Sequence, residues 1–162
     1  GYEVANGATS IWERWDSYTK DKGFIHNAAM NSFSHYAFGA VNEWIFENIL
    51  GIQPIDRGYQ TFHIKPEIPG PGVELKKATG SYHSIAGRIA SAWDYSGAIK
   101  KHQLEIPVNT TAYFHLASPS QAQVDINGES ITKSKLVQEI TVSETGFILK
   151  LGSGDYDITI RP

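Results

Sequence analysis

After Gly58 the sequence changes from a helical pattern to an alternating one, and this change constrains the fold more than any other feature. Nine short segments follow in which apolar and polar residues alternate, the pattern of half-buried β-strands. Turn signals separate the segments, and Asn127-Gly128 is a dipeptide that favours a two-residue hairpin. Short strands at near-regular spacing predict an antiparallel β-sandwich rather than a parallel sheet. The expected strands are 60–65, 73–81, 87–95, 98–106, 111–117, 123–126, 135–142, 146–151 and 156–160.

One helix is predicted before this change, from Ser32 to Leu50. Its apolar residues recur at steps of three and four, and Gly51 followed by Pro54 ends the run. The residues that offer N-cap oxygens are Asn31, Ser32 and Ser34. The apolar face is wide enough that the helix needs cover on most sides, and the first 56 residues contain little to cover it. The sequence therefore predicts two domains, one at 1–57 that is part of something larger and a β-sandwich at 58–162.

The predicted helix carries a stripe of large apolar residues, Trp44, Ile45 and Ile49. Burying each large apolar side chain contributes roughly 1.5–3 kcal/mol, so the stripe is costly to leave in water. We expect the segment from Ser32 to Leu50 to pack on the sandwich and to associate with a second copy of the chain.

Composition narrows the classes of partner. The 162 residues carry a formal net charge of -3, so the basic footprint of a nucleic-acid-binding protein is absent. No apolar run approaches the roughly 20 residues that a transmembrane helix needs, and no signal-peptide pattern begins the chain. The absence of cysteine excludes disulfides and thiolate metal ligands, but it does not fix the compartment: secreted, periplasmic and cytoplasmic locations all stay open.

The segment from Thr9 to Asp16 places one carboxylate, Glu13, between two indoles and next to Arg14. Flat aromatic faces such as those of Trp12 and Trp15 suit the C–H faces of a sugar ring. A carboxylate held in such a place can work as an acid or a base. The alternative is a Trp-rich loop packed on a core, with Glu13 paired to Arg14 or solvated.

The sequence contains none of the common nucleophile, phosphate-binding or zinc signatures, and it predicts no cofactor and no metal. Of the six histidines, only His26 and His35 lie near the Trp-Glu-Trp segment. His35 begins the predicted helix and is a candidate site residue; the alternative is a capping or core histidine. The histidines expected to be hydrogen-bonded or half-exposed within strands are His63, His102 and His115, since they lack metal-ligand spacing.

Two motifs resemble glycoside hydrolase family 78, the α-L-rhamnosidases. Residues 7–16, Gly-Ala-Thr-Ser-Ile-Trp-Glu-Arg-Trp-Asp, and residues 30–41, Met-Asn-Ser-Phe-Ser-His-Tyr-Ala-Phe-Gly-Ala-Val, are similar to the end of the family's catalytic domain. Residues 87–93 and 106–112 are similar to parts of its C-terminal domain. The resemblance implies the fold class α+β, with the last helices of an (α/α)6 barrel followed by an antiparallel β-sandwich, in a glycosidase of bacterial type.

The resemblance also implies roles for individual residues. The family inverts the configuration of the anomeric carbon, and Glu13 matches its general base. His35 matches a histidine that contacts bound rhamnose, and Trp12 or Trp15 can wall the pocket. The implied partners are rhamnose-containing glycosides or polysaccharides, with no nucleic acid and no membrane. Arg14 would support an ionised base only if its side chain turned toward Glu13.

The departure from the family is size. Its members are several times longer, and their general acid lies before the Trp-Glu-Trp motif; Asp16 and Glu43 are present but do not match it. The chain therefore resembles the C-terminal piece of a rhamnosidase, and we expect no hydrolysis by this piece alone. The alternative is a non-catalytic carbohydrate-binding or structural β-sandwich. Exposed aromatics would favour sugar binding, and buried ones would favour packing; the candidates are Tyr82, Trp93, Tyr95 and Tyr113.

Overall fold

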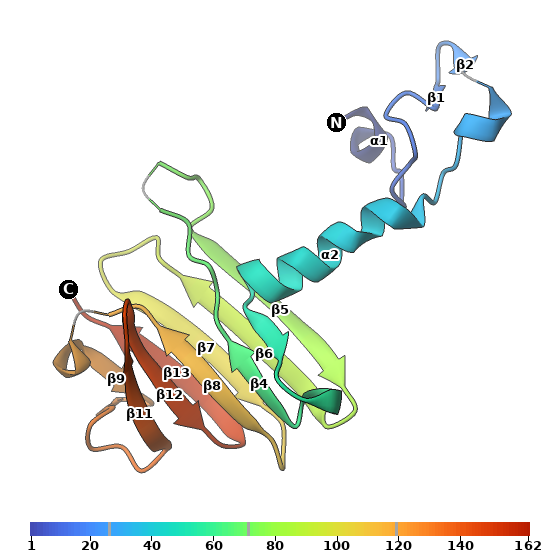
Figure 1. Ribbon diagram of the computed structural model, residues 1–162. Coiled ribbons are helices and arrows are strands. Elements are labelled where there is room, and N and C mark those ends of the chain that lie inside the picture. The colour runs from blue at the N-terminus through green and yellow to red at the C-terminus, as the bar shows by residue number, and fades with distance from the viewer. Residues whose placement is uncertain (26, 71, 119) are drawn as a thin grey trace. The chain divides into compact units, whose positions relative to one another are not determined.

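The computed structural model describes residues 1–25, 27–70, 72–118 and 120–162. The chain forms two compact units, Gly1–Trp44 and Ile45–Pro162. The larger unit is a β-sandwich, coloured from green to red in Figure 1. No helix in the described part of the chain has the length and apolar character needed to cross a membrane.

The first sheet of the sandwich has six strands in the order β10-β9-β13-β7-β6-β5. Every neighbouring pair is antiparallel, as the sequence pattern predicts. Asn127 and Gly128 both have positive φ, 49° and 82°, which is the mirror-image turn expected between β9 and β10. The strands are β5 (Lys77–Ser84), β6 (Gly87–Asp94), β7 (Lys100–Ile106), β9 (Val124–Ile126), β10 (Glu129–Ser130) and β13 (Gly154–Ile160).

The second sheet has five strands in the order β11-β12-β8-β4-β3. One pair departs from the predicted antiparallel pattern, because β4 and β8 run parallel and make the sheet mixed. The chain leaves β4, forms three strands of the other sheet and returns to β8, and parallel neighbours require such a long connection. The strands are β3 (Ile52–Pro54), β4 (Thr61–Ile64), β8 (Thr111–Leu116), β11 (Val137–Ser143) and β12 (Gly146–Leu151).

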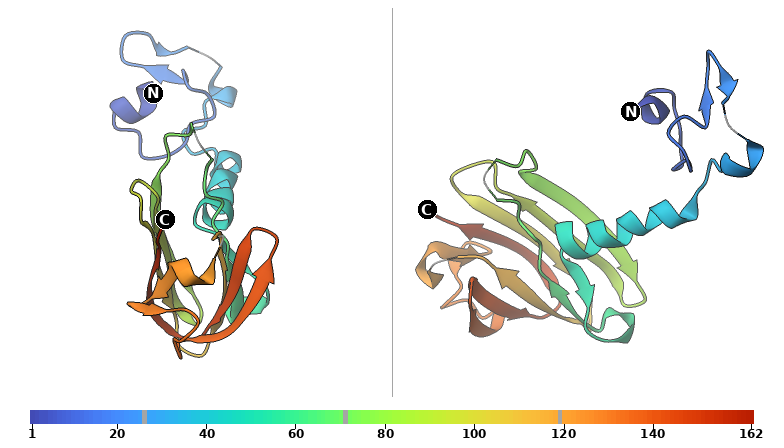
Figure 2. Two further views of the ribbon diagram at one scale, coloured as in Figure 1. Left: turned by 90° about the vertical axis from the view of Figure 1, so that its left-hand side faces the viewer. Right: turned by 45° about the horizontal axis from the view of Figure 1, so that its top comes forward.

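The two sheets face each other as two layers, visible in the left view of Figure 2. Alternate residues of each strand point into one apolar core, so the period of two in the sequence becomes an inside and an outside. All nine predicted strands are present, with shifts at their ends, whereas the short strands β3 and β10 were not predicted. Side chains with no exposed surface include Phe62, Phe114 and Leu149 from one sheet and Ile89, Ile126 and Ile158 from the other.

The helical segment begins at Tyr36, so the predicted start at Ser32 is wrong. The backbone groups of Ser32 and His35 instead bond to Glu13 and Ile11 in a separate segment, which keeps this stretch extended. Gly51, with φ 75°, ends the segment as predicted. It consists of η2 (Tyr36–Ala40), α2 (Val41–Trp44) and η3 (Ile45–Ile49), which are 3-10, α and π turns respectively.

The last residues of this segment belong to the larger unit and pack on the sandwich. Leu50 is buried in the core, and Phe46 packs against it. Trp44 and Ile45 stay 52% and 38% exposed, so the predicted apolar stripe is only partly covered. Two short 3-10 turns complete the larger unit, η4 (Arg57–Tyr59) and η5 (Gln121–Gln123).

The smaller unit has little regular structure. Its short elements are α1 (Tyr2–Ala5), β1 (Tyr18–Thr19), β2 (Gly23–Phe24) and η1 (Ala28–Met30), and β1 pairs with β2. Among its described residues only Ser17 and Asn31 are buried, and both are polar. An apolar core of the kind seen in the sandwich is therefore missing from the described part of this unit.

The compact unit that contains the sandwich begins at Ile45, earlier than the boundary that the sequence pattern places between residues 57 and 58. Leu50 and Ile52 lie in the core, with 4% and 2% of their surface exposed. Truncated chains can show at which residue the independently folding unit begins.

We predict that a chain beginning at Ile45 melts cooperatively and at a higher temperature than one beginning at Arg57. The shorter chain lacks two buried side chains, each contributing roughly 1.5–3 kcal/mol. Thermal and urea unfolding of both chains give the comparison. Equal midpoints for the two chains would show that residues 45–56 add nothing to the sandwich.

Gly51 is also predicted to tolerate no side chain. A β-carbon there would overlap the backbone of Lys65 and Pro66, in addition to the strain of its positive φ. Gly51→Ala should therefore lower the unfolding midpoint more than Gly128→Ala, whose φ is 82° but whose β-carbon would meet open space. Left-handed backbone alone costs about 1–2 kcal/mol. Similar losses in the two variants would contradict the overlap.

Candidate functional site

Two segments of the smaller unit lie side by side and form the site that contains Glu13. The backbone N–H of Glu13 donates to the carbonyl of Ser32 over 2.8 Å, and that of His35 donates to the carbonyl of Ile11 over 2.9 Å. The Ser10 hydroxyl donates to the carbonyl of Phe33. These bonds bring the Trp-Glu-Trp segment and the residues before the helix together, as the family resemblance implies.

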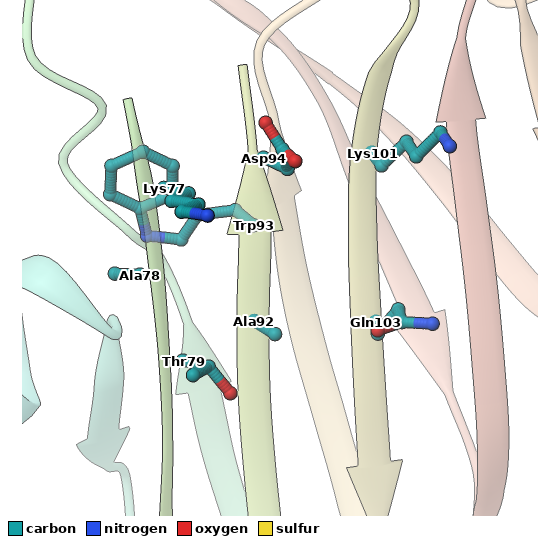
Figure 3. A pocket seen from close by; sticks show the side chains of 8 residues that line it. All are labelled: Lys77, Ala78, Thr79, Ala92, Trp93, Asp94, Lys101 and Gln103. Atoms are coloured by element: carbon teal, nitrogen blue, oxygen red, sulfur yellow. The ribbon is translucent and has the colours of Figure 1, made fainter. Parts of the chain in front are cut away.

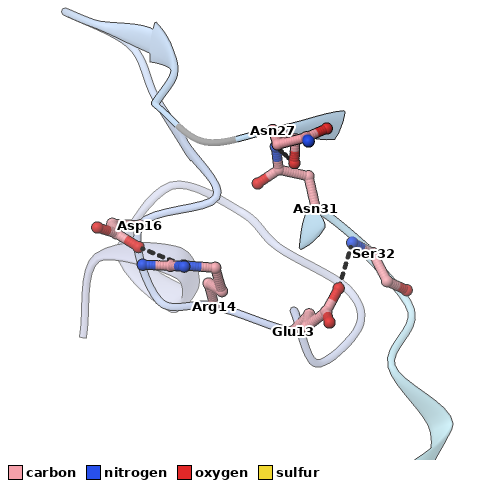
Figure 4. A network of polar contacts seen from close by, with 6 residues as sticks. All are labelled: Glu13, Arg14, Asp16, Asn27, Asn31 and Ser32. Atoms are coloured by element: carbon pink, nitrogen blue, oxygen red, sulfur yellow. Dashed lines mark hydrogen bonds and ion pairs between the residues drawn. The ribbon is translucent and has the colours of Figure 1, made fainter. Parts of the chain in front are cut away.

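The two carboxylate oxygens of Glu13 have different surroundings. Oε2 accepts a hydrogen bond from the backbone N–H of Ser32 over 3.1 Å, drawn in Figure 4. Oε1 lies 3.9 Å from Nε2 of His35, beyond hydrogen-bond length. The Glu13 side chain is 19% exposed. One oxygen is thus fixed to the backbone, and the other faces an imidazole.

Arg14 does not turn toward Glu13. Its Nε lies 3.5 Å from Oδ1 of Asp16, and both side chains are substantially exposed. Figure 4 shows the guanidinium directed to Asp16 and away from the Glu13 carboxylate. The alternative in which Glu13 pairs with Arg14 is therefore wrong, and support of the base by Arg14 finds no basis here.

The two tryptophans of the motif have different environments. Trp12 is half-buried and meets Phe33 edge-to-face, with ring centroids 4.9 Å apart; Phe33 in turn meets Phe24 at 5.9 Å. Trp15 is 85% exposed. The structure therefore brings Trp12 into the cluster around Glu13 and leaves the indole of Trp15 on the surface.

His35 occupies the N-cap position of η2, but its side chain makes no capping hydrogen bond. Its ring packs against Phe38, with centroids 4.8 Å apart, and lies parallel to Tyr36 at 6.2 Å. Nδ1 is buried and has no hydrogen-bond partner among the described residues, while Nε2 points at Glu13. The second histidine near the motif, His26, lies outside the described residues.

Three contributors to this site were not predicted: the backbone of Ser32, and the rings of Phe33 and Phe38. Every residue except proline has a backbone N–H, so the sequence alone did not distinguish Ser32 as the donor to the Glu13 carboxylate. Phe33 was assigned to the apolar face of the predicted helix, and Phe38 was placed in that helix without a role. Both lie close to the candidate histidine in the sequence Phe33-Ser34-His35-Tyr36-Ala37-Phe38, and this proximity was the one sign that they belong to the site.

The other interior histidines are hydrogen-bonded, as predicted. Nε2 of His102 lies 3.0 Å from the Tyr95 hydroxyl, and Nε2 of His115 lies 3.0 Å from Nδ1 of His63. Burial lowers the pKa of His102 to about 4. Burial, together with the charges of His63 and Lys65, lowers the pKa of His115 to about 4. The described residues contain no group of three or more His, Asp or Glu side chains placed to hold a metal ion.

A hollow lies over β5, β6 and β7 on the six-stranded sheet, and Figure 3 shows its lining. It measures about 640 Å³. Trp93 borders it, but its indole is only 2% exposed because it belongs to the core side. Tyr82 is 39% exposed and packs on Tyr59, with centroids 4.8 Å apart. The polar lining residues are Lys77, Thr79, Asp94, Lys101 and Gln103.

Comparisons with known proteins agree with this arrangement. Residues 51–131 match the family model of the bacterial alpha-L-rhamnosidase C-terminal domain, and residues 1–49 match that of the bacterial alpha-L-rhamnosidase six-hairpin glycosidase domain. An alpha-L-rhamnosidase of Formosa agariphila is 33% identical over 160 residues, which are 99% of this chain and 17% of that protein.

Solved structures give the same result. The alpha-L-rhamnosidase of Streptomyces avermitilis complexed with L-rhamnose matches 99% of this chain, with a TM-score of 0.76 and 31% identity. The alpha-L-rhamnosidase from Dictyoglumus thermophilum matches all of it, with a TM-score of 0.76 and 25% identity. The chain spans 14% and 17% of the length of these two proteins.

The buried histidines predict a pH-dependent stability. The pKa of His102 is about 4 in the folded state and 6.5 in an ordinary environment, so both states are neutral above pH 6.5. As pH falls from 6.5 toward 4, the unfolded state takes up the proton first, and His102 alone lowers the free energy of unfolding by about 1.4 kcal/mol per pH unit. Melting temperatures between pH 7 and 4.5 should show this slope.

His102→Gln should reduce that slope without abolishing it, because His115 is perturbed in the same direction. His83→Gln, at an exposed histidine on β5, serves as the matched control and should keep the full slope. An unchanged slope in His102→Gln would exclude His102 as its source.

Proposed function

The chain belongs to the bacterial α-L-rhamnosidase family, and we propose that it supplies the end of the catalytic domain and the C-terminal β-domain of an enzyme that removes terminal α-L-rhamnose. One observation carries this proposal. The Glu13 carboxylate is fixed at Oε2 by the Ser32 backbone, and its Oε1 is left facing His35 beside the half-buried Trp12. A fixed carboxylate with one open oxygen is suited to act as a general base.

We propose an inverting reaction with Glu13 as the base. Such glycosidases use two carboxyl groups roughly 6.5–9.5 Å apart, which leaves room for a water molecule. The water oxygen attacks the anomeric carbon and its proton passes to Oε1 of Glu13. The bond from the anomeric carbon to the leaving oxygen breaks, and that oxygen takes a proton from a carboxylic acid. The residues matched to the family motif in this chain do not supply that acid.

The distance of 3.9 Å between Oε1 of Glu13 and Nε2 of His35 suits this step. It is too long for a direct hydrogen bond, but one water molecule can bond to both atoms. His35 then holds either the attacking water or a sugar hydroxyl. The packing of its ring on Phe38 limits the ring's freedom, which favours a fixed position for that contact.

The aromatic residues suit a 6-deoxy sugar. Rhamnose carries a methyl group where other hexoses carry a hydroxymethyl group, and an indole wall accommodates a methyl group without an unsatisfied polar atom. Trp12 is proposed as that wall because Phe33 holds it edge-to-face next to Glu13. Trp15 is proposed as a second wall of the pocket, and its exposed indole offers a free face but no fixed position.

A non-catalytic sugar-binding sandwich finds less support. Tyr82 packs on Tyr59, and the one aromatic residue in the lining of the hollow, Trp93, is almost fully buried. An aromatic platform, the usual partner of a sugar ring, is thus missing from the lining of that hollow. Self-association through the helical segment remains a prediction, which sedimentation at several concentrations tests.

We predict that the 162-residue chain alone does not cleave an aryl α-L-rhamnoside, because the acid of the pair is not among its matched residues. In a full-length relative whose C-terminal portion is replaced by this chain, Glu13→Gln should lower kcat by about 10²–10⁴-fold, the usual contribution of a general base. KM should change little, because the amide keeps the shape of the side chain.

Glu43→Gln is the matched control for this experiment, since Glu43 lies on α2 and is exposed. It should leave kcat unchanged. Near-normal turnover in Glu13→Gln would exclude Glu13 as the base. Turnover by the 162-residue chain that Glu13→Gln abolishes would show that no second domain is needed.

A further inference from the structure

The carbonyl groups at the end of the helical segment are bonded by groups of the β-sandwich. The indole Nε1–H of Trp93 donates to the carbonyl of Ile49 over 2.8 Å, and the hydroxyl of Ser91 donates to the carbonyl of Leu50 over 2.7 Å. Both donors lie on β6. The last carbonyls of a helix have no partner within it, so these contacts act as its C-terminal cap.

Two further carbonyls of the same turn are bonded in the same way. The side-chain amide of Gln53 donates to the carbonyl of Glu47 over 2.8 Å. The backbone N–H of Glu67 donates to the carbonyl of Asn48 over 2.8 Å. The four successive carbonyls from residue 47 to residue 50 therefore each have a partner outside the helix, and all these partners belong to the sandwich unit.

The two donors on β6 are unusual for a sandwich core. Trp93 is 2% exposed and Ser91 is fully buried, and each keeps a polar group among apolar neighbours. Burying such a group is costly unless it is hydrogen-bonded, and both use their bond on the helix end rather than on the sheet. Opposite Ser91 on β5 stands Gly80, where a β-carbon would overlap the side chain of Leu50. The absence of a side chain at Gly80 thus leaves room for Leu50 at the end of the helix.

The rest of the helical segment has little to stabilise it. None of the residues in η2, α2 and η3 is buried, and the segment changes from 3-10 to α to π turns along its length. Isolated helices of fewer than about 12–15 residues are marginal in water. The described hydrogen bonds from outside the segment to its last carbonyls are thus all at one end, and His35 of the candidate site stands at the other end, in the N-cap position.

We propose that Trp93 and Ser91 are positioning residues for the candidate site. By capping the helical segment they keep Tyr36–Ile49 ordered, and this order holds the backbone of His35 and Phe38. The effect is on order and passes along the continuous chain. The C-terminal β-domain would then serve as a cap for the last helix before it. The link to catalysis rests on the proposed function of Glu13 and His35.

Amide hydrogen exchange on the 162-residue chain tests the cap. Trp93→Phe keeps an aromatic ring but removes the pyrrole ring with its N–H, whereas Ser91→Ala removes only the hydroxyl. Each variant should exchange faster at residues 36–50 by about 3- to 10-fold, the effect of losing one neutral hydrogen bond. Exchange in β12 and β13 should stay unchanged.

Tyr95→Phe is the matched control, because Tyr95 follows β6 and its hydroxyl contacts His102 instead of the helix. It should leave residues 36–50 unchanged. Equal acceleration in Tyr95→Phe, or acceleration spread over the whole sandwich, would overturn the proposal. So would acceleration limited to residues 45–50, because His35 would then not depend on the cap.

Activity gives the readout that a purely structural role would not move. In the full-length chimera, Trp93→Phe and Ser91→Ala should raise KM by about 3- to 10-fold with a smaller change in kcat, since a sugar contact is disordered while the base keeps its Ser32 anchor. An unchanged KM in both variants would overturn the positioning role. If Glu13→Gln also retains turnover, the proposed function fails separately, while the exchange data still decide the cap.

Discussion

The requirement that buried backbone groups find partners shapes this chain at the point where the helix meets the sandwich. The last carbonyls of the helix lie among buried residues, where they need hydrogen-bond donors from the protein. Trp93 and Ser91 of the sheet are those donors, and both are buried. Gly51 then turns the chain with positive φ against the backbone of Lys65, whose N–H donates to the Gly51 carbonyl over 2.8 Å. The first strand of the sandwich can begin only because this end is closed.

The same requirement decides where the helix begins. Ser32 and His35 give their backbone groups to Glu13 and Ile11, so they are not free to start a helical turn. The extended stretch that results places the Ser32 N–H on the Glu13 carboxylate. In a helix from Ser32, as the serine-rich N-cap pattern suggests, the Ser32 carbonyl would accept a bond from within the helix, whereas here it accepts the N–H of Glu13. The geometry around Glu13 is therefore bound to the late start of the helix at Tyr36.

Local pattern was enough to predict the sandwich, because alternation along a strand directly states which face is buried. Phe147, Leu149 and Leu151 on β12 are buried at every second position, and Asn127-Gly128 turns as its dipeptide requires. Contacts between distant segments were not predictable in this way. The parallel pairing of β4 with β8 depends on the path of the chain between them. The sequence also does not show whether Trp93 contacts a sugar or donates to a helix carbonyl, as it does here. Glu13, Trp12 and His35 were candidates from the sequence itself, and a family resemblance gave them roles, whereas their partners Ser32 and Phe38 were found only in the structure.

The two units hold their residues in place by different means. The sandwich has an apolar core whose central side chains are fully buried, so hydrophobic burial gives it stability of its own. The described part of the smaller unit buries only Ser17 and Asn31, and its order rests on hydrogen bonds and ring contacts between short segments. A carboxylate that must be fixed at Oε2 and open at Oε1 is easier to build from such directional contacts than from a packed core, because packing would close the open oxygen. Within the described part of this chain the candidate site therefore depends on directional contacts, and the proposed cap at the end of the helical segment is a further contact of this kind.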